Sequence, residues 1–326
     1  MKLLSTLLFS ILLSTCTKDP QEGKAPEQIE IKNLNVIIAP DLSNRIDPKI
    51  HPKPVNDTVI INGLYDAIGN KFLKIGGRSS LQKDTYSLDF INRGALNSEQ
   101  INSEDFIIDF EKFGTKQLLR SDYIRSGLKK DVSRCKSQVK LLYDTQIKNP
   151  SGSDIYSYLN STVNNVLSNS SVEKFELSPG IEGVVSTENI IILFTDGYIE
   201  NATAQKGYNL SKKTIDKIRV EFNKTKNDDL ETFINDNPSY QINPLKNPSL
   251  AEVNLIVVEM VDRSTDKNGV SVLHPTDFEI MGAVWSQWLN QSNCHNFKFV
   301  PAQNSADQVI SQISIFIEKS IAKNNK

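Results

Sequence analysis

The chain has 326 residues, of which 38% are hydrophobic and 23% are charged. This composition is typical of a globular protein, and it excludes a disordered or a collagen-like chain. With 37 basic and 39 acidic residues the net charge is −2, so no basic excess points to nucleic acid as a partner.

The first sixteen residues have the layout of a secretory signal. Lys2 precedes an apolar stretch, residues 3–13, that is too short to span a bilayer as a helix. The segment ends in Leu-Ser-Thr-Cys, which resembles a bacterial lipobox with Cys16 as the lipidated residue. The resemblance implies a lipid anchor in the cell envelope, expected in the outer membrane with the protein either periplasmic or surface-exposed. The alternative is a plain cleaved signal in which Cys16 is incidental.

Residues 17–32 are polar and contain two prolines, so we expect a flexible tether. A single folded domain is then expected over residues 33–326. Cys135 and Cys294 within it are far apart and in no CxxC pattern, which favours buried free thiols over a disulfide. The three histidines form no zinc-binding pattern.

Strands and helices are predicted to alternate along this domain. Apolar or alternating runs predict strands at 34–39, 85–91, 105–113, 190–194, 253–261 and 296–302. Helical spacing predicts helices at 57–73, 115–146, 151–167, 277–291 and 305–321, the first of them capped by Asp57 or Thr58. The alternation predicts an α/β fold, a doubly wound and mostly parallel central sheet with helices on both faces.

A connection of about fifty residues, 201–250, separates two of the core strands. It is predicted to hold a charged helix near 211–235, followed by a segment rich in Asn and Pro. So long a connection is usually functional or mobile. Three interpretations stay open: an insertion that contacts a partner, a lid over a site, or a solvated loop.

Three polar turns follow predicted core elements: DLSNR from residue 41, SGSD from residue 151 and FTDG from residue 194. In doubly wound sheets, ligands bind beyond the carboxyl ends of the strands, where the strand order reverses. These turns are therefore the places to expect a site. Taken alone, Asp41 and Asp196 could also be carboxylates that cap turns at strand ends.

Together the three turns resemble those of the von Willebrand factor A domain, also called the integrin I-like domain, over roughly residues 33–321. The resemblance implies a metal-ion-dependent adhesion site built from a DxSxS sequence, a hydroxyl from a second loop and an Asp from a third. Asp41 and Ser43 match the first two DxSxS positions, Ser153 takes the second-loop position, and Asp196 matches the third-loop Asp. These oxygen ligands suit Mg²⁺ or another divalent cation. In the family a carboxylate of a protein partner completes the coordination, so that the ion serves recognition.

Arg45 departs from this pattern, because it stands where the family has the last Ser of DxSxS. A guanidinium stays charged and cannot bind a metal. Arg45 could pair with Asp41 or Asp196, which would leave a metal-free relic of the site. Alternatively, Arg45 could point outward while Asp47 helps to hold an ion through water.

Three classes of function follow from these patterns. The first is a membrane-anchored, non-enzymatic protein-binding or adhesion module, with a degenerate metal-ion-dependent adhesion site that contacts a partner through an acidic side chain. The second is a metal-dependent phosphohydrolase that uses Asp41 and Asp196, although Ser43 has no evident His partner. The third is a scaffold protein with a metal-free site. We favour the first class.

Overall fold

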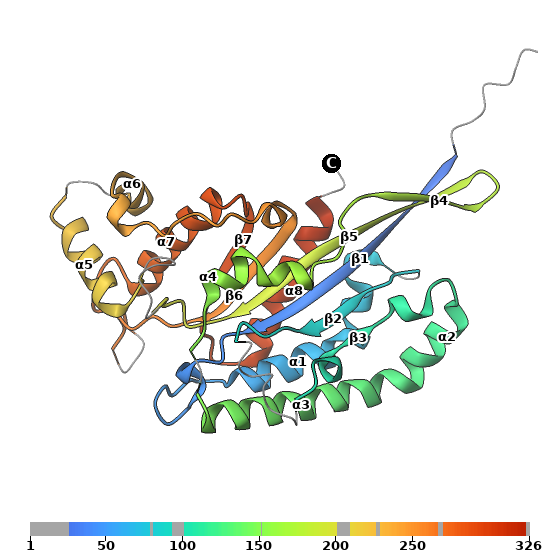
Figure 1. Ribbon diagram of the computed structural model, residues 1–326, viewed down its shortest axis with the longest axis horizontal. Helices are drawn as coiled ribbons and strands as arrows, with labels where there is room; N and C mark the ends of the chain where they lie inside the picture. Colours follow the sequence, from blue (N-terminus) through green and yellow to red (C-terminus); the bar gives the residue numbers. More distant parts are fainter. Residues whose placement is uncertain are drawn as a thin grey trace, which may run out of the picture.

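The computed structural model describes residues 26–78, 81–92, 101–150, 152–200, 209–225, 229–266 and 270–323. In these residues a seven-stranded, mostly parallel sheet carries helices on both faces (Figure 1). The strands are β1 (Glu27–Pro40), β2 (Thr85–Leu88), β3 (Ile108–Asp109), β4 (Glu173–Ser178), β5 (Ile181–Phe194), β6 (Val253–Met260) and β7 (Asn296–Pro301). The helices are α1 (Asp57–Asn70), α2 (Gln117–Asp122), α3 (Leu128–Lys148), α4 (Ile155–Asn160), α5 (Lys212–Phe222), α6 (Leu230–Asp236), α7 (Asp277–Gln291) and α8 (Ala306–Lys323). The predicted α/β fold is confirmed.

The strand order places a switch point in the middle of the sheet. The order is β3-β2-β1-β5-β6-β7, with β4 paired to β5 outside this path. β1, β2, β5, β6 and β7 run parallel, whereas β3 and β4 run antiparallel to their neighbours. The chain winds one way from β1 to β2 and the other way from β5 to β7. The crevice at the carboxyl ends of β1 and β5 is therefore the expected ligand position in a doubly wound sheet.

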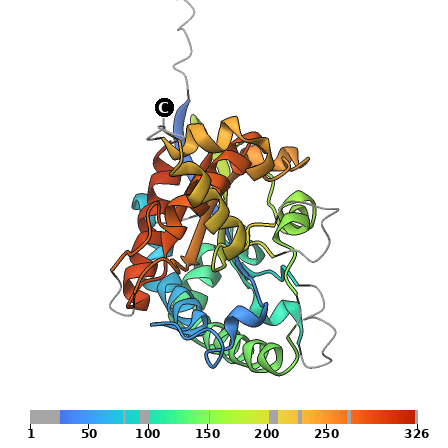
Figure 2. The ribbon, with the colours of Figure 1, turned by 90° about the vertical axis from the view of Figure 1, so that its left-hand side faces the viewer.

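Alternation along the central strands divides the interior into two cores. Leu34, Val36 and Ile38 of β1 pack with α1, α3 and α8, whereas Ile37 and Ala39 pack with α4, α5, α6 and α7. Successive side chains of a strand point to opposite faces, so one apolar run serves both cores. Figure 2 shows the yellow to orange helices on the opposite side of the sheet from blue α1 and green α3.

β1 is longer than its apolar run, because it begins at Glu27 and pairs over fourteen residues with β5. The expected tether is therefore wrong over residues 27–32, where isoleucines alternate with polar residues in strand fashion. At about 3.3 Å per residue, β1 is about 46 Å long. The signal segment with Cys16 and tether residues 17–25 lie outside the described residues. No helix in the part of the chain that the structure describes is long and apolar enough to cross a membrane.

Several predicted boundaries need correction. The strand expected at 105–113 is only the two-residue β3, with 3-10 turns on both sides. The cap of α1 is Asn56, not Asp57 or Thr58. The hairpin strand β4 was not predicted, because its residues are mostly exposed and carry no buried apolar run.

The connection 201–250 is part of the folded core where it is described. The charged helix expected there is two helices, α5 and α6, which both contact α7. The core on the α7 face of the sheet includes four buried residues of these two helices: Ile215, Ile218, Phe233 and Ile234. The interpretation as a solvated loop is therefore wrong for residues 209–225 and 229–250.

Cys135 and Cys294 are both free and buried. They belong to different cores, Cys135 to the core with α3 and Cys294 to the core with α7. The predicted free thiols are therefore confirmed.

A substitution at Gly197 tests the geometry of the tight turn that follows β5. Its φ is +87°, and an added Cβ would lie 2.8 Å from Met260 Cε and 2.8 Å from Met281 Sδ. Gly197→Ala should lower the free energy of unfolding by about 2–4 kcal/mol, measured by urea denaturation. Gly282→Ala is the matched control. It lies in α7 with open space around it, and should stabilise the chain by about 0.5–1 kcal/mol. A Gly197→Ala variant as stable as the wild type would contradict this geometry.

Candidate functional site

The carboxyl ends of β1 and β5 bring the predicted site residues together. Asp41 follows β1 directly, and its N–H donates to the carbonyl of Phe194, the last residue of β5, at 2.9 Å. Asp196 lies two residues beyond β5, and Ser153 lies in the loop before α4. Asp41, Ser43, Ser153 and Asp196 line one cavity of about 280 Å³. This cavity lies at the switch point of the sheet, where the sequence places it.

Both carboxylate oxygens of Asp41 have partners. The N–H of Ser43 donates to Oδ1 at 3.0 Å, which closes the turn after β1. The hydroxyl of Thr195 donates to Oδ2 at 3.1 Å, and Nε of Arg45 lies 3.5 Å from the same oxygen. Asp41 therefore joins the loops that follow β1 and β5.

Arg45 is turned inward and is only 3% exposed. Its Nη2 donates to Oδ2 of Asp57, the first residue of α1, at 2.6 Å. The expected pairing of Arg45 with Asp41 is present at 3.5 Å, whereas the interpretation with Arg45 pointing outward is wrong. Asp47, which that interpretation invoked, accepts a hydrogen bond from the N–H of Lys49 instead.

Asp57 is the main counterion of Arg45, and the sequence predicted it only as a helix cap. Lys53 Nζ lies 2.8 Å from its Oδ1, and the hydroxyl of Tyr143 in α3 donates to Oδ2 at 3.3 Å. Burial alone would raise the pKa of Asp57, but Arg45 and Lys53 outweigh it and lower that pKa to about 2. Asp57 therefore stays ionised, and it ties the loop after β1 to α1 and α3.

A second guanidinium pairs with the other carboxylate of the site. Nη2 of Arg263, in the loop after β6, donates to Oδ2 of Asp196 at 2.8 Å, and the N–H of Tyr198 donates to Oδ1 at 3.3 Å. The guanidinium of Arg263 also stacks on the Tyr198 ring, with its carbon 4.1 Å from the ring centroid. Burial raises the pKa of Asp196, and Asp41 adds to this effect while Arg45 and Arg263 oppose it.

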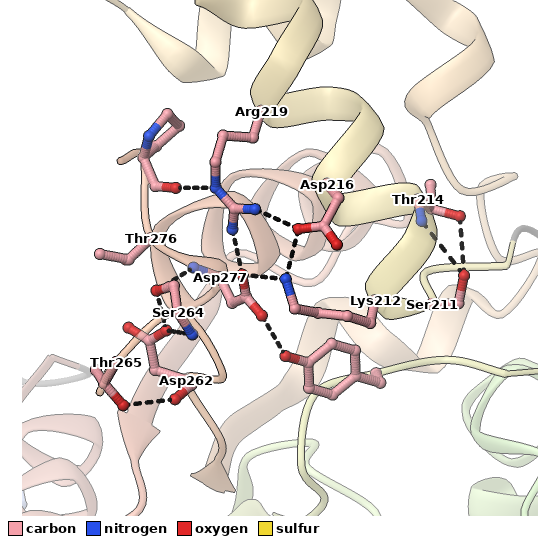
Figure 3. Close-up of polar contacts among 12 residues, drawn as sticks. Ser211, Lys212, Thr214, Asp216, Arg219, Asp262, Ser264, Thr265, Thr276 and Asp277 are labelled. Carbon is pink, nitrogen blue, oxygen red and sulfur yellow. Dashed lines mark hydrogen bonds and ion pairs between the residues drawn. The ribbon is translucent and has the colours of Figure 1, made fainter. Parts of the chain in front are cut away.

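A polar network continues from Tyr198 to the α5 segment (Figure 3). The Tyr198 hydroxyl donates to Oδ2 of the fully buried Asp277, at the start of α7, at 2.6 Å. Oδ1 of Asp277 pairs with Arg219 and Lys212 of α5, and its N–H donates to the hydroxyl of Ser264. The charged face of α5 is thus tied to the loops at the candidate site.

No described residue of 209–225 or 229–250 lines the cavity. The interpretation of this connection as a lid therefore finds no support in its described part. Through Asp277, α5 acts on the site only at a distance, by holding Tyr198.

The residues present do not fit a divalent ion in this arrangement. Arg45 lies against Asp41 and Arg263 lies against Asp196, so each carboxylate that would bind the ion already faces a positive charge. A divalent ion between them would meet a guanidinium at short range. In the described residues, no group of three or more His, Cys, Asp or Glu side chains could hold a metal ion.

Ser153 does not take part in these contacts. Its Oγ is buried, and it has no hydrogen-bond partner in the part of the chain that the structure describes. Both Ser153 and His51 line the cavity. Neither side chain takes part in the contacts described above, so both could contact a ligand in the cavity.

Glu259 was not predicted as part of this region. It lies near the end of β6 with a φ of +69°, beside an irregularity in the pairing with β7, and is fully buried. Both of its carboxylate oxygens lack a hydrogen-bond partner among the described residues. Burial and the nearby Asp57 raise its pKa to about 7, against the opposing charges of Lys53 and Arg45.

The sequence did not predict which residues contact or lie near Asp41, Arg45 and Asp196. Only some of these neighbours carry a pattern by which they could have been found. Glu259 could have been found, because it is an acidic residue within the apolar run of the buried strand β6. Arg263 lies in the polar turn after that strand, where the rule of carboxyl ends also applies. Asp57 and Tyr143 carried no such signal, because their pairing depends on how two helices pack.

Comparisons with known proteins assign no role to these residues. No family model matches the chain, and no curated protein matches it. The geometry of the site and the chemistry of its side chains are therefore the grounds for a functional proposal.

The raised pKa of the buried Glu259 predicts that the stability of the chain falls as the pH rises. The folded chain keeps the Glu259 proton up to about pH 7, whereas the unfolded chain releases it near pH 4.3. Stability is therefore lost as the pH rises through this window, by about 4 kcal/mol from this group. Glu259→Gln should unfold at higher urea than the wild type at pH 8, and at similar urea at pH 5.

The exposed Glu318 of α8 supplies the matched control. Glu318→Gln should show the same change in the urea concentration of unfolding between pH 5 and pH 8 as the wild type. Parallel pH profiles of wild type and Glu259→Gln would contradict the assignment.

Proposed function

We propose that this chain is a membrane-anchored, non-enzymatic protein-binding module of the von Willebrand A type. Its site binds a partner without a resident divalent ion. One observation carries the proposal: four residues from three loops, Asp41, Ser43, Ser153 and Asp196, line one cavity at the switch point. The two guanidiniums of Arg45 and Arg263 supply the positive charge that an ion would otherwise provide.

The arrangement favours binding over catalysis. Nucleophilic catalysis requires a base within hydrogen-bond reach of the hydroxyl. In the described residues no base contacts the Oγ of Ser153. The phosphohydrolase alternative needs an ion between Asp41 and Asp196, where the guanidiniums lie. The scaffold alternative shares this geometry and differs only in having no ligand at the cavity.

Arg263 is the residue that best suits an acidic partner. Its side chain is 34% exposed, whereas that of Arg45 is buried. An acidic side chain of a partner protein could exchange with Asp196 on the guanidinium of Arg263, and it would meet the unpartnered hydroxyl of Ser153 in the same cavity. A carboxylate–guanidinium pair of this kind gives direction as well as affinity.

The long β1 places the site away from the anchor. The strand starts at Glu27, eleven residues after Cys16, and ends at the cavity about 46 Å further on. A lipid on Cys16 would hold the first end at the membrane of the cell envelope. The cavity would then face away from the membrane, toward soluble or surface partners.

Photo-crosslinking tests the binding role directly. A photoreactive amino acid at the exposed Asn44, on the rim of the cavity, should give one protein adduct in intact cells that make the chain. The same amino acid at the exposed Lys140 of α3 is the positional control and should not give this adduct. Arg263→Ala should weaken the adduct at Asn44 by about fivefold, since an exposed carboxylate pair is worth roughly 1 kcal/mol.

Two outcomes would overturn the proposal. The first is a chain that gives no protein adduct at Asn44. The second is an adduct that is equally strong at Lys140 or in the Arg263→Ala variant.

A further inference from the structure

A three-stranded arm projects from the sheet on the side opposite the cavity. It consists of residues 27–32 of β1, β4, and residues 181–186 of β5, and it extends to the upper right in Figure 1. In the described part of the chain β4 pairs only with β5, so its other edge is free. Five of its six residues are exposed. A free strand edge offers unpaired backbone groups to another strand.

The two faces of β4 differ in character. Phe175 and Leu177 lie on one face, and the ring of Phe175 covers Gly183 of β5. Lys174 and Glu176 lie on the other face, because neighbouring side chains of a strand point to opposite sides. β4 therefore presents an aromatic face and a charged face to whatever pairs with its free edge.

The charged face is incompletely matched within the chain. Glu176 lies directly opposite Glu182 of β5, and like charges opposite each other destabilise a strand pair. Lys174 Nζ lies 3.3 Å from Glu182, and Gln28 donates to the same carboxylate. Glu176 has no ion-pair partner among the described residues. A positive charge beside the free edge of β4 would offset the repulsion between Glu176 and Glu182.

We propose that β4 pairs antiparallel with β4 of a second copy of this chain, about a twofold axis at Phe175. The two Phe175 side chains then face each other. Lys174 lies opposite the partner subunit's Glu176, and Glu176 lies opposite the partner subunit's Lys174. Aromatic pairs and opposite charges are both favourable cross-strand pairs.

The sequence EKFELS selects this register against its neighbours. In an antiparallel pair, the hydrogen bonds re-form only when one strand slides past the other by two residues. Each such slide moves the twofold axis by one residue along β4. An axis at Lys174 places lysine against lysine, and an axis at Glu176 places glutamate against glutamate. The register centred on Phe175 is the one between them, and it alone pairs opposite charges on both sides of the axis.

The contact is small, so the dimer is expected to be weak. A six-residue strand pair buries less than the roughly 1,000 Å² that a stable interface usually needs.

Charge reversal tests the proposal. Sedimentation velocity on the full chain dispersed in detergent should show dimers that increase with protein concentration. Lys174→Glu and Glu176→Lys should each weaken self-association by about tenfold or more, because each places like charges opposite each other twice. An equimolar mixture of the two variants should recover it, because each mixed pair again places opposite charges together. The double variant Lys174→Glu/Glu176→Lys should also recover it.

The variants also separate this surface from other modes of association. Both substitutions are at exposed positions, and circular dichroism checks that each variant folds. A wild-type chain that is monomeric at every concentration would overturn the proposal. Association that is unchanged in the single variants, or that the mixture fails to recover, would assign the contact to another surface and would overturn it too.

Discussion

The buried ion pair between Arg45 and Asp57 holds the candidate site in its present form. It connects the loop after β1 to the first turn of α1, and Lys53 and Tyr143 add two more contacts to the same carboxylate. Charges taken out of water are costly unless they are paired and hydrogen-bonded. The carboxylate of Asp57 has three partners, whereas Nε and Nη1 of Arg45 are buried without a hydrogen-bond partner among the described residues. The position of Asp41, and with it the cavity, follows from this pair.

The same constraint bears on the position at which the DxSxS pattern that the turn resembles has a serine and this chain has Arg45. A Ser at this position would leave Asp57 with one cation, Lys53, beside the hydroxyl of Tyr143, and it would open space beside Asp41. The guanidinium fills that space and neutralises both carboxylates. The positive charge beside the carboxylates of this crevice thus belongs to the chain itself.

Polar contacts extend from this centre across the carboxyl edge of the sheet. Asp196 pairs with Arg263, which stacks on Tyr198, and Tyr198 donates to the buried Asp277. Arg219 of α5 completes the path. The path joins α5 of the long connection between β5 and β6 to the site, and no described residue of α5 lines the cavity. A partner that displaced Asp196 from Arg263 would therefore also act on Tyr198.

Much of this arrangement can be predicted from sequence, and the limits have physical causes. The buried strands appear as apolar runs because both faces of a covered parallel sheet are dry. The loops carrying Asp41 and Asp196 could be placed together because β1 and β5 are parallel. Ser153, in the loop before α4, was placed with them by the family resemblance. The counterion of Arg45 could not be predicted, since it depends on the rotation and depth of α1. The β4 hairpin was missed for a different reason, because an exposed strand lacks a buried face to produce a pattern.

The central claim is that Arg45, and not a divalent ion, neutralises the carboxylates at the switch point. Crystals of the chain soaked in Mn²⁺ and measured by anomalous diffraction test it most directly. The claim predicts no anomalous peak between Asp41 and Asp196, with the Arg45 guanidinium in contact with Asp41 and Asp57. A peak at about 2.0–2.2 Å from these carboxylates and from the Ser43 or Ser153 hydroxyl, with Arg45 displaced, would contradict it.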